Sequence, residues 1–116
     1  MKYLNTKLTV CTLLISLVSA SQSFAGSIQG AGALPCGEWV EQRTRGDHNM
    51  ALAWVMGFMS SYNHYTYNGS KKNGTFGDIN HNSIALWMDN YCKANPLESV
   101  YGGSVKLIEE MVKNNA

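Results

Sequence analysis

From about residue 36 onwards, apolar residues recur along the chain at the spacing of an α-helix. The clearest stripe covers residues 50–62, with apolar positions at i, i+1, i+4, i+5, i+8, i+9 and i+12. The side chains at these positions are Met50, Ala51, Trp54, Val55, Phe58, Met59 and Tyr62. A stripe of this period and width predicts one amphipathic helix. Gly57 lies within it, and we expect this glycine to allow close packing against another helix.

Two more helices are predicted in the C-terminal half of the chain. A helix from about Asn82 to Lys93 carries its apolar residues on one face, and these are Ile84, Trp87, Met88 and Tyr91. The next helix is expected to begin with Asn95 as its N-cap, because Pro96 and Glu98 then occupy the first turn as in a capping box. The buried stripe of this last helix consists of Val100, Ser104, Leu107, Ile108 and Met111.

Polar segments separate the predicted helices. Pro35 precedes a short helical turn over residues 36–41, which Gly46 and Asp47 end. Asp47 is expected to cap the helix that follows. Residues 63–80 are polar and contain Asn-Gly and Gly-Asp turn signals, which predict either a mobile loop or a short hairpin.

Glycine is frequent at two further places. Residues 26–34 are rich in Gly and Ala without any period, which is typical of a flexible leader. In the last helix, Gly102 and Gly103 each lower helix stability by about 1 kcal/mol relative to Ala, unless close packing requires a glycine there. The whole pattern predicts an all-α fold, a small bundle of about four helices in one domain over residues 35–116.

Residues 1–25 have the three parts of a secretory signal peptide. Lys2 and Lys7 make the first part basic, and residues 8–18 are an apolar run of 11 residues. Small residues follow, so cleavage is expected after Ala25, with Ala20 as the alternative. The apolar run is shorter than the roughly 20 residues of a membrane-spanning helix. We therefore expect export to the periplasm and no stable membrane insertion.

The cysteine count supports an exported protein. Cys11 lies inside the apolar run after a bulky residue, so it does not fit a lipid-acceptor cysteine and leaves with the signal peptide. The two cysteines that remain, Cys36 and Cys92, predict one disulfide bond that closes the bundle. In the chain-entropy model a loop of this length gives roughly 4 kcal/mol of stabilisation. Neither cysteine has the CxxC or CxxH neighbours of a redox or zinc site.

The charge balance excludes some classes of partner. The full chain has a net charge of +1, and loss of Lys2 and Lys7 with the leader changes it to −1. A chain with this charge balance has no strong positive electrostatic field that would attract nucleic acid or anionic lipid. We therefore expect no nucleic-acid partner.

Catalytic motifs are missing from the sequence. It contains no Gly-x-Ser-x-Gly, His-Glu-x-x-His or phosphate-binding loop. A metal site made of His64, Asp78 and His81 would lack the i, i+4 pairing of helical zinc ligands. The sequence therefore predicts a protein that is not an enzyme and that needs no metal or other cofactor.

One pattern in the mature part resembles a known family. It combines Cys-x-Glu-Trp near the mature N-terminus, an aromatic-rich helix and Tyr-Cys-Lys-x-Asn-Pro-Leu before the last helix; the matching residues are Cys36, Glu38, Trp39, Trp54, Tyr91, Cys92, Lys93, Asn95 and Pro96. This layout is similar to the HdeA/HdeB group of periplasmic acid-stress chaperones, over about 80 of the 91 mature residues. Tai-type periplasmic immunity proteins share the layout. The chain differs from the chaperones in its low charge and in its Tyr-, Asn- and Gly-rich loop over residues 62–80.

The resemblance implies a protein-binding function without catalysis. It implies a chain, often a homodimer, that exposes apolar surface at low pH and holds unfolding client proteins. The residues expected to bind clients or a partner are Trp39, Trp54, Val55, Phe58, Met59, Tyr62, Tyr65 and Tyr67. The alternative is an immunity protein or an accessory of a conjugation or secretion system, which the Tyr-rich loop favours because such loops suit protein interfaces.

Overall fold

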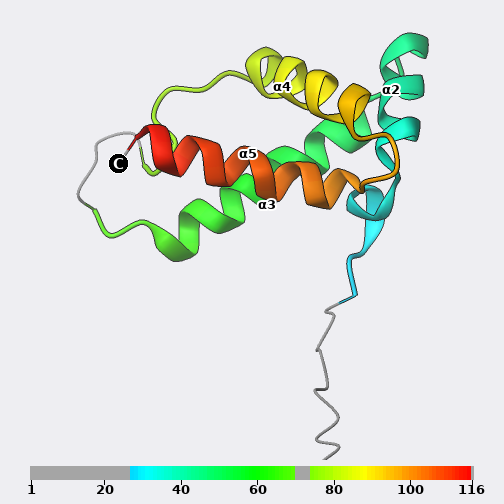
Figure 1. Cartoon of the computed structure of the whole chain (residues 1–116). Coiled ribbons are helices and arrows are strands. Elements are labelled where there is room, and N and C mark those ends of the chain that lie inside the picture. Colours follow the sequence, from blue (N-terminus) through cyan, green and yellow to red (C-terminus); the bar gives the residue numbers. More distant parts are fainter. Residues whose placement is uncertain (1–26, 70–73, 116) are drawn as a thin grey trace, which may run out of the picture.

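A computed structural model describes residues 27–69 and 74–115, so the predicted signal peptide lies outside the described residues. The chain forms a 3₁₀ turn η1 (Gly30–Ala33) and the helices α2 (Cys36–Arg45), α3 (Asn49–Thr66), α4 (His81–Ala94) and α5 (Val100–Asn114). The helices α3 and α5 run side by side, α4 lies along them, and α2 stands across one end (Figure 1). The predicted all-α bundle closed by one disulfide is confirmed.

The core lies where α2, α3, α4 and α5 meet. Its buried apolar side chains come from every element, and they include Trp39, Ala51, Val55, Met59, Ile84, Met88, Val100, Leu107 and Ile108. The helical stripes predicted for α3, α4 and α5 supply most of this set. Among the described residues, no helix combines the length and the hydrophobicity needed to cross a membrane.

The predicted flexible leader is wrong for its described part. Gly30–Ala33 forms η1, and its Ala31 and Gly32 are buried. A Cβ atom on Gly32 would lie 2.1 Å from the Trp54 ring, so only glycine lets the indole lie against this turn. Trp54 Nε1 also donates to the Gln29 carbonyl at 2.9 Å. The segment is therefore part of the fold, held by contacts that a search for hydrophobic period does not detect.

The last helix begins later than predicted. Ser99, not Asn95, is its N-cap, and the Ser99 hydroxyl accepts from the Gly102 amide at 3.0 Å. Residues before it are held by backbone pairing with the start of α2, because the Cys36 amide donates to the Glu98 carbonyl at 2.7 Å. This pairing between distant segments overrides the local capping signal at Asn95, which ends α4 instead.

The two other predicted element boundaries also need correction. The helix α2 extends to Arg45, beyond the short turn expected at residues 36–41, and ends where Gly46 adopts a φ of +80°. Asp47 does not cap α3; its carboxylate accepts from Arg45, and the N-cap position belongs to His48.

The glycines of the long helices have opposite environments. A Cβ on Gly103 would lie 2.9 Å from Met88 Cε and 3.0 Å from the Tyr91 ring, so this glycine allows α4 and α5 to approach. Nothing lies within 4 Å of a Cβ on Gly57. The expectation that Gly57 packs against another helix of the bundle is therefore wrong. Relative to alanine, Gly57 lowers the stability of this helix by about 1 kcal/mol, and no contact within the described fold compensates for that loss.

Candidate functional site

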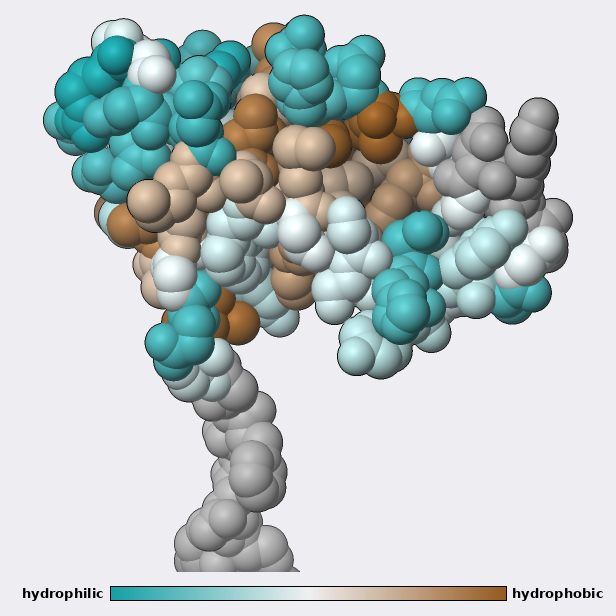
Figure 2. Space-filling model, turned by 180° about the vertical axis from the view of Figure 1, so that it is seen from behind, coloured by the Kyte–Doolittle hydropathy of each residue, from teal (hydrophilic) through white to brown (hydrophobic). Residues whose placement is uncertain are grey.

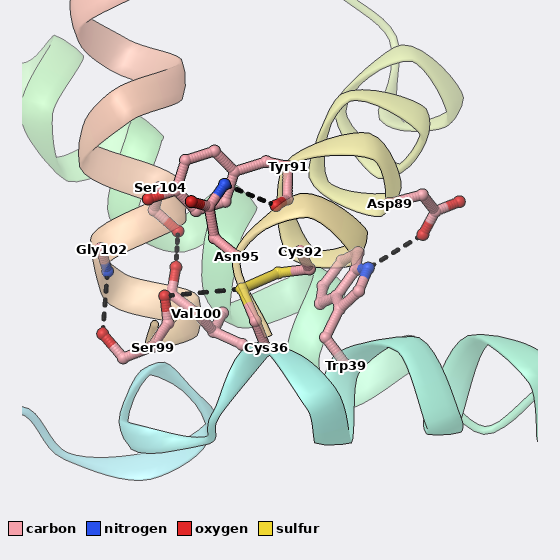
Figure 3. The surroundings of a disulfide bond; sticks show 10 residues. All are labelled: Cys36, Trp39, Asp89, Tyr91, Cys92, Asn95, Ser99, Val100, Gly102 and Ser104. Atoms are coloured by element: carbon pink, nitrogen blue, oxygen red, sulfur yellow. Dashed lines mark hydrogen bonds between the residues drawn. A yellow bond between two sulfur atoms is a disulfide. The ribbon is translucent and has the colours of Figure 1, made fainter. Parts of the chain in front are cut away.

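The disulfide joins the first residue of α2 to the last turn of α4 (Figure 3). Cys36 and Cys92 are fully buried, and their Cα atoms lie 4.7 Å apart, within the usual range for a disulfide. The predicted bond is thereby confirmed. Because both sulfur atoms are shielded from solvent, this bond serves as a structural link rather than an exchange site.

One carboxylate next to the disulfide joins the same two helices. Asp89 on α4 accepts from Trp39 Nε1 at 2.9 Å (Figure 3), and it accepts from Arg43 Nε and Nη2 at 2.8 and 2.9 Å. Arg43 Nη1 lies 2.8 Å from His48 Nε2. We call Trp39, Arg43, His48 and Asp89 the Asp89 cluster. In this cluster Arg43 and Asp89 form a two-pronged (bidentate) ion pair. The Trp39 indole also hydrogen-bonds to Asp89, and the His48 imidazole lies against Arg43.

The charges of the Asp89 cluster set the protonation of its carboxylate. Burial by itself raises the pKa of Asp89. The hydrogen bonds from Arg43 and Trp39 and the charges of Arg43 and Lys93 together lower this pKa by more than burial raises it. The net pKa therefore lies below its ordinary value. The pKa of Arg43 is raised, chiefly by its hydrogen bonds to Asp89. Asp89 is thus ionised at neutral pH and holds Trp39 in the core.

His48 accepts a hydrogen bond in the Asp89 cluster. An arginine only donates, so His48 Nε2 accepts and Nδ1 carries the ring proton. Within the described structure that Nδ1 atom is buried without a hydrogen-bond partner.

Solvent reaches the Asp89 cluster through an open groove of about 250 Å³ between α2 and α4. Val40, Arg43, Thr44, Asp89 and Lys93 line this groove. Protons can therefore reach the Asp89 carboxylate without unfolding of the domain.

The predicted binding residues do not form one surface. Trp39, Val55 and Met59 are buried in the core, with Trp39 and Val55 fully inaccessible. Trp54, Phe58 and Tyr62 are half-buried: Trp54 stacks on Phe58 at 5.4 Å, and Tyr62 stacks on Phe76 at 5.8 Å. Tyr65 is 83% exposed and Tyr67 39%. Of the eight predicted binding residues, Tyr65 and Tyr67 are the ones classed as exposed in the folded domain.

A second feature is the outward side of α3, which sequence analysis missed. Its exposed residues are Met50, Ala53, Met56, Gly57, Ser60, Ser61 and His64, and we call this set the α3 outer face. The helix contains no Asp, Glu, Lys or Arg. Seen from behind, brown and tan atoms cross the middle of the molecule between teal regions (Figure 2). The missing charge over residues 49–66 was visible in the sequence and could have identified this face.

An open groove lies at one edge of the α3 outer face. It has a volume of about 200 Å³ and lies between the C-terminal half of α3, the segment after residue 75 and the start of α4. Its lining residues are Met56, Met59, Ser60, Asn63, Phe76, Gly77, Ile79 and Ile84. Most of these side chains suit contact with apolar groups, and the one hydroxyl among them, that of Ser60, donates to the Met56 carbonyl.

The candidate metal ligands do not gather. Among the described residues, no group of three or more His, Cys, Asp or Glu side chains is placed to hold a metal ion, and this includes His64, Asp78 and His81.

Comparison with known proteins adds no relative. The chain matches no protein-family model, no curated protein and no solved structure.

Proposed function

We propose that this chain is an exported protein-binding protein that releases apolar surface in acid, as the resemblance to the HdeA/HdeB chaperones implies. The observation that supports it is the pairing of two different links between α2 and α4. One link, the disulfide, is indifferent to acid. The other, the Asp89 cluster, depends on one ionised carboxylate.

Acid acts on the second link alone. When Asp89 takes up a proton it loses its ion pair with Arg43, and the Trp39 indole loses a charged acceptor. The mature chain meanwhile changes from a net charge of −1 to about +10 as eight acids and three histidines bind protons. Repulsion at that charge favours an open form. The disulfide keeps the open chain compact.

The opened domain supplies apolar surface for clients. Trp39 is buried on α2, and α2 packs against α4, so movement of α2 uncovers buried apolar side chains of these two helices. Trp54, Phe58 and Met59 of α3 become available as the bundle loosens. Large apolar patches of this kind bind unfolded segments of other proteins.

The test is aggregation of a model client protein between about pH 2 and pH 4, where carboxylates titrate. Light scattering is recorded with the mature chain present at equimolar and higher ratios. We expect suppression in acid and none at neutral pH. An equal mass of a small disulfide-bonded protein without client-binding activity is the control. Unchanged aggregation at every ratio would contradict the proposal.

A second candidate function is supported by the surfaces that are exposed without acid. Tyr65 projects from the end of α3, and the α3 outer face is free of charge. These features suit a folded-state partner, as in an immunity protein or a secretion accessory. Pull-downs at neutral and at acid pH separate the two functions. A partner protein that stays tightly bound at both pH values favours the second function. A toxin or transfer operon around the gene would favour it too.

A further inference from the structure

The groove between α2 and α4 enters the proposed function only as the route by which protons reach Asp89, yet most of its lining is polar or charged. It has a volume of about 250 Å³, and its lining residues are Val40, Arg43, Thr44, Asp89 and Lys93. Two cations and one carboxylate give this lining a net charge of +1. The mature chain as a whole has a net charge of −1. The groove therefore concentrates positive charge on a chain whose overall charge is negative, and such a concave site attracts small anions.

Arg43 has donors left over after it binds Asp89. Its guanidinium group carries five N–H donors. Nε and Nη2 donate to the Asp89 carboxylate at 2.8 and 2.9 Å, and Nη1 lies 2.8 Å from His48 Nε2. Nη1 and Nη2 each carry two hydrogens, so one N–H group of each remains for another acceptor. Because the Arg43 side chain is 31% exposed, an acceptor that arrives from solvent can reach it.

Lys93 supplies the second cation from the other helix. It follows Asp89 by four residues on α4 and therefore lies on the same side of that helix. The charge of Lys93 contributes to the lowered pKa of Asp89, so the two groups act on each other across the groove. The Lys93 side chain is exposed, and within the described residues its ammonium group forms no salt bridge. A lysine in the last turn of a helix offsets the helix dipole, but that role does not require a place in this groove.

We infer that the groove binds a small free oxyanion of the phosphate or sulfate class between Arg43 and Lys93. The two remaining N–H groups of Arg43 suit two oxygen atoms of one anion, and Lys93 adds a point charge from the opposite wall. A tetrahedral oxyanion offers several oxygen atoms at once, which a chloride ion does not. Because the groove is open and the Asp89 carboxylate repels anions, the dissociation constant should be roughly millimolar.

The surroundings of the groove favour a small ion over an extended anionic surface. On the same short helix, Arg45 is shared by the three carboxylates of Glu38, Glu41 and Asp47. A membrane or a nucleic acid would meet this surplus of negative charge, whereas an ion inside the groove would not. The inference concerns the folded chain at neutral pH, so it is independent of the proposed binding of clients in acid.

The first test follows the backbone amide signals of the mature chain by NMR at neutral pH while sulfate or phosphate replaces chloride at constant ionic strength. We expect saturable shifts for residues 40–44 and 89–93 with either oxyanion. Lys93→Gln should weaken binding at least about fivefold, because one of the two cations is lost. Lys113→Gln removes the same charge from an exposed site on α5, at the other end of the bundle from α2 (Figure 1). This matched control should change the affinity by less than about twofold, because salt screens a distant charge.

The second test adds a cation to the groove. Thr44 is exposed, and its hydroxyl donates to the Val40 carbonyl within α2 at 3.0 Å, so this helix should tolerate a lysine there. Thr44→Lys should tighten sulfate binding at least about threefold, whereas Ser61→Lys, which adds the same charge to an exposed site on α3, should not.

The third test separates a free oxyanion from the same chemistry on a surface. Vesicles of phosphatidylglycerol carry phosphate groups, and the mature chain should not co-sediment with them at neutral pH. Co-sedimentation that Lys93→Gln abolishes would overturn the assignment of a free anion. The inference would also be overturned by the absence of saturable shifts with both oxyanions, by equal affinities of Lys93→Gln and Lys113→Gln, or by a Thr44→Lys affinity no higher than that of Ser61→Lys.

Discussion

At the scale of single residues, the environment of a side chain decides its role more than its type. Gly57 and Gly103 both lie in long helices, yet only Gly103 touches a neighbouring helix. The chain has eight Asp and Glu residues, and among the described residues Asp89 is distinguished by hydrogen bonds from both an indole and a guanidinium. Sequence analysis could not single out Asp89, because its partners Trp39 and Arg43 are 50 and 46 residues away along the chain.

The two glycines predict opposite effects of one substitution. Gly103→Ala should destabilise the domain by about 1–2 kcal/mol, because the new methyl group meets Met88 and Tyr91. Gly57→Ala should stabilise the domain by up to about 1 kcal/mol, because alanine favours the helix and the new methyl group meets no other atom within 4 Å. Thermal unfolding of both variants at low concentration measures the two effects. Shifts of the same sign would contradict the assignment of Gly103 as the contact between α4 and α5.

Asp89 predicts a specific dependence of stability on pH. Its pKa in the folded chain lies below the ordinary value near 3.8, so the folded form binds this proton more weakly than the unfolded form. The stabilisation is complete above that ordinary value and is lost as the pH falls through the lowered pKa. Asp89→Asn should lower the free energy of unfolding by about 2–3 kcal/mol at neutral pH. It should also reduce the dependence of that free energy on pH in the range where Asp89 titrates.

Denaturant unfolding of wild type and Asp89→Asn from neutral pH down to about pH 2 measures that dependence. Asp47→Asn, which removes an exposed acid paired only with Arg45, is the control and should change stability by less than about 0.5 kcal/mol. If the free energy of unfolding depended on pH in the same way for Asp89→Asn and Asp47→Asn, a specific contribution of the Asp89 cluster to stability would be contradicted.

At the scale of elements, regular stripes were predictable and long-range pairing was not. The helical period of residues 50–62 and 82–93 predicts α3 and α4 because each buries one face against the core. The start of α5 was misplaced because backbone pairing of residues 35–37 with 96–99 extends the segment around Asn95. The turn η1 was missed because it is fixed by the Trp54 indole over Gly32, which has no counterpart in local sequence.

Loss of each of the two links between α2 and α4 should depend differently on pH. Removal of the disulfide in the Cys36→Ser/Cys92→Ser variant should cost roughly 4 kcal/mol, because the unfolded chain regains the freedom of the closed loop. This loss should be independent of pH, unlike the loss caused by Asp89→Asn. Unfolding of the two variants at neutral pH and in mild acid checks this. A disulfide contribution that changes with pH in step with Asp89 would contradict the separation of the two links.

At the scale of the whole molecule, charge is distributed unevenly. Salt bridges lie on α2 and α5 and between α2 and α4, whereas the outward side of α3 has none within the described structure. The overall class, a small disulfide-closed helical domain, was predictable from cysteine count and hydrophobic period. The division of the expected binding residues into buried and exposed groups was not, because a helical stripe alone does not show which aromatic side chains the other helices cover.

The central claim is that protonation of Asp89 releases the apolar surface that binds clients. The most direct measurement records client protection and the fluorescence of Trp39 against pH in a Trp54→Phe/Trp87→Phe background, with and without Asp89→Asn. Both signals should change together in acid, and Asp89→Asn should move both midpoints to higher pH by the same amount. Asp47→Asn should leave them in place. Client protection whose midpoint is unaffected by Asp89→Asn, or protection without any change at Trp39, would contradict the claim.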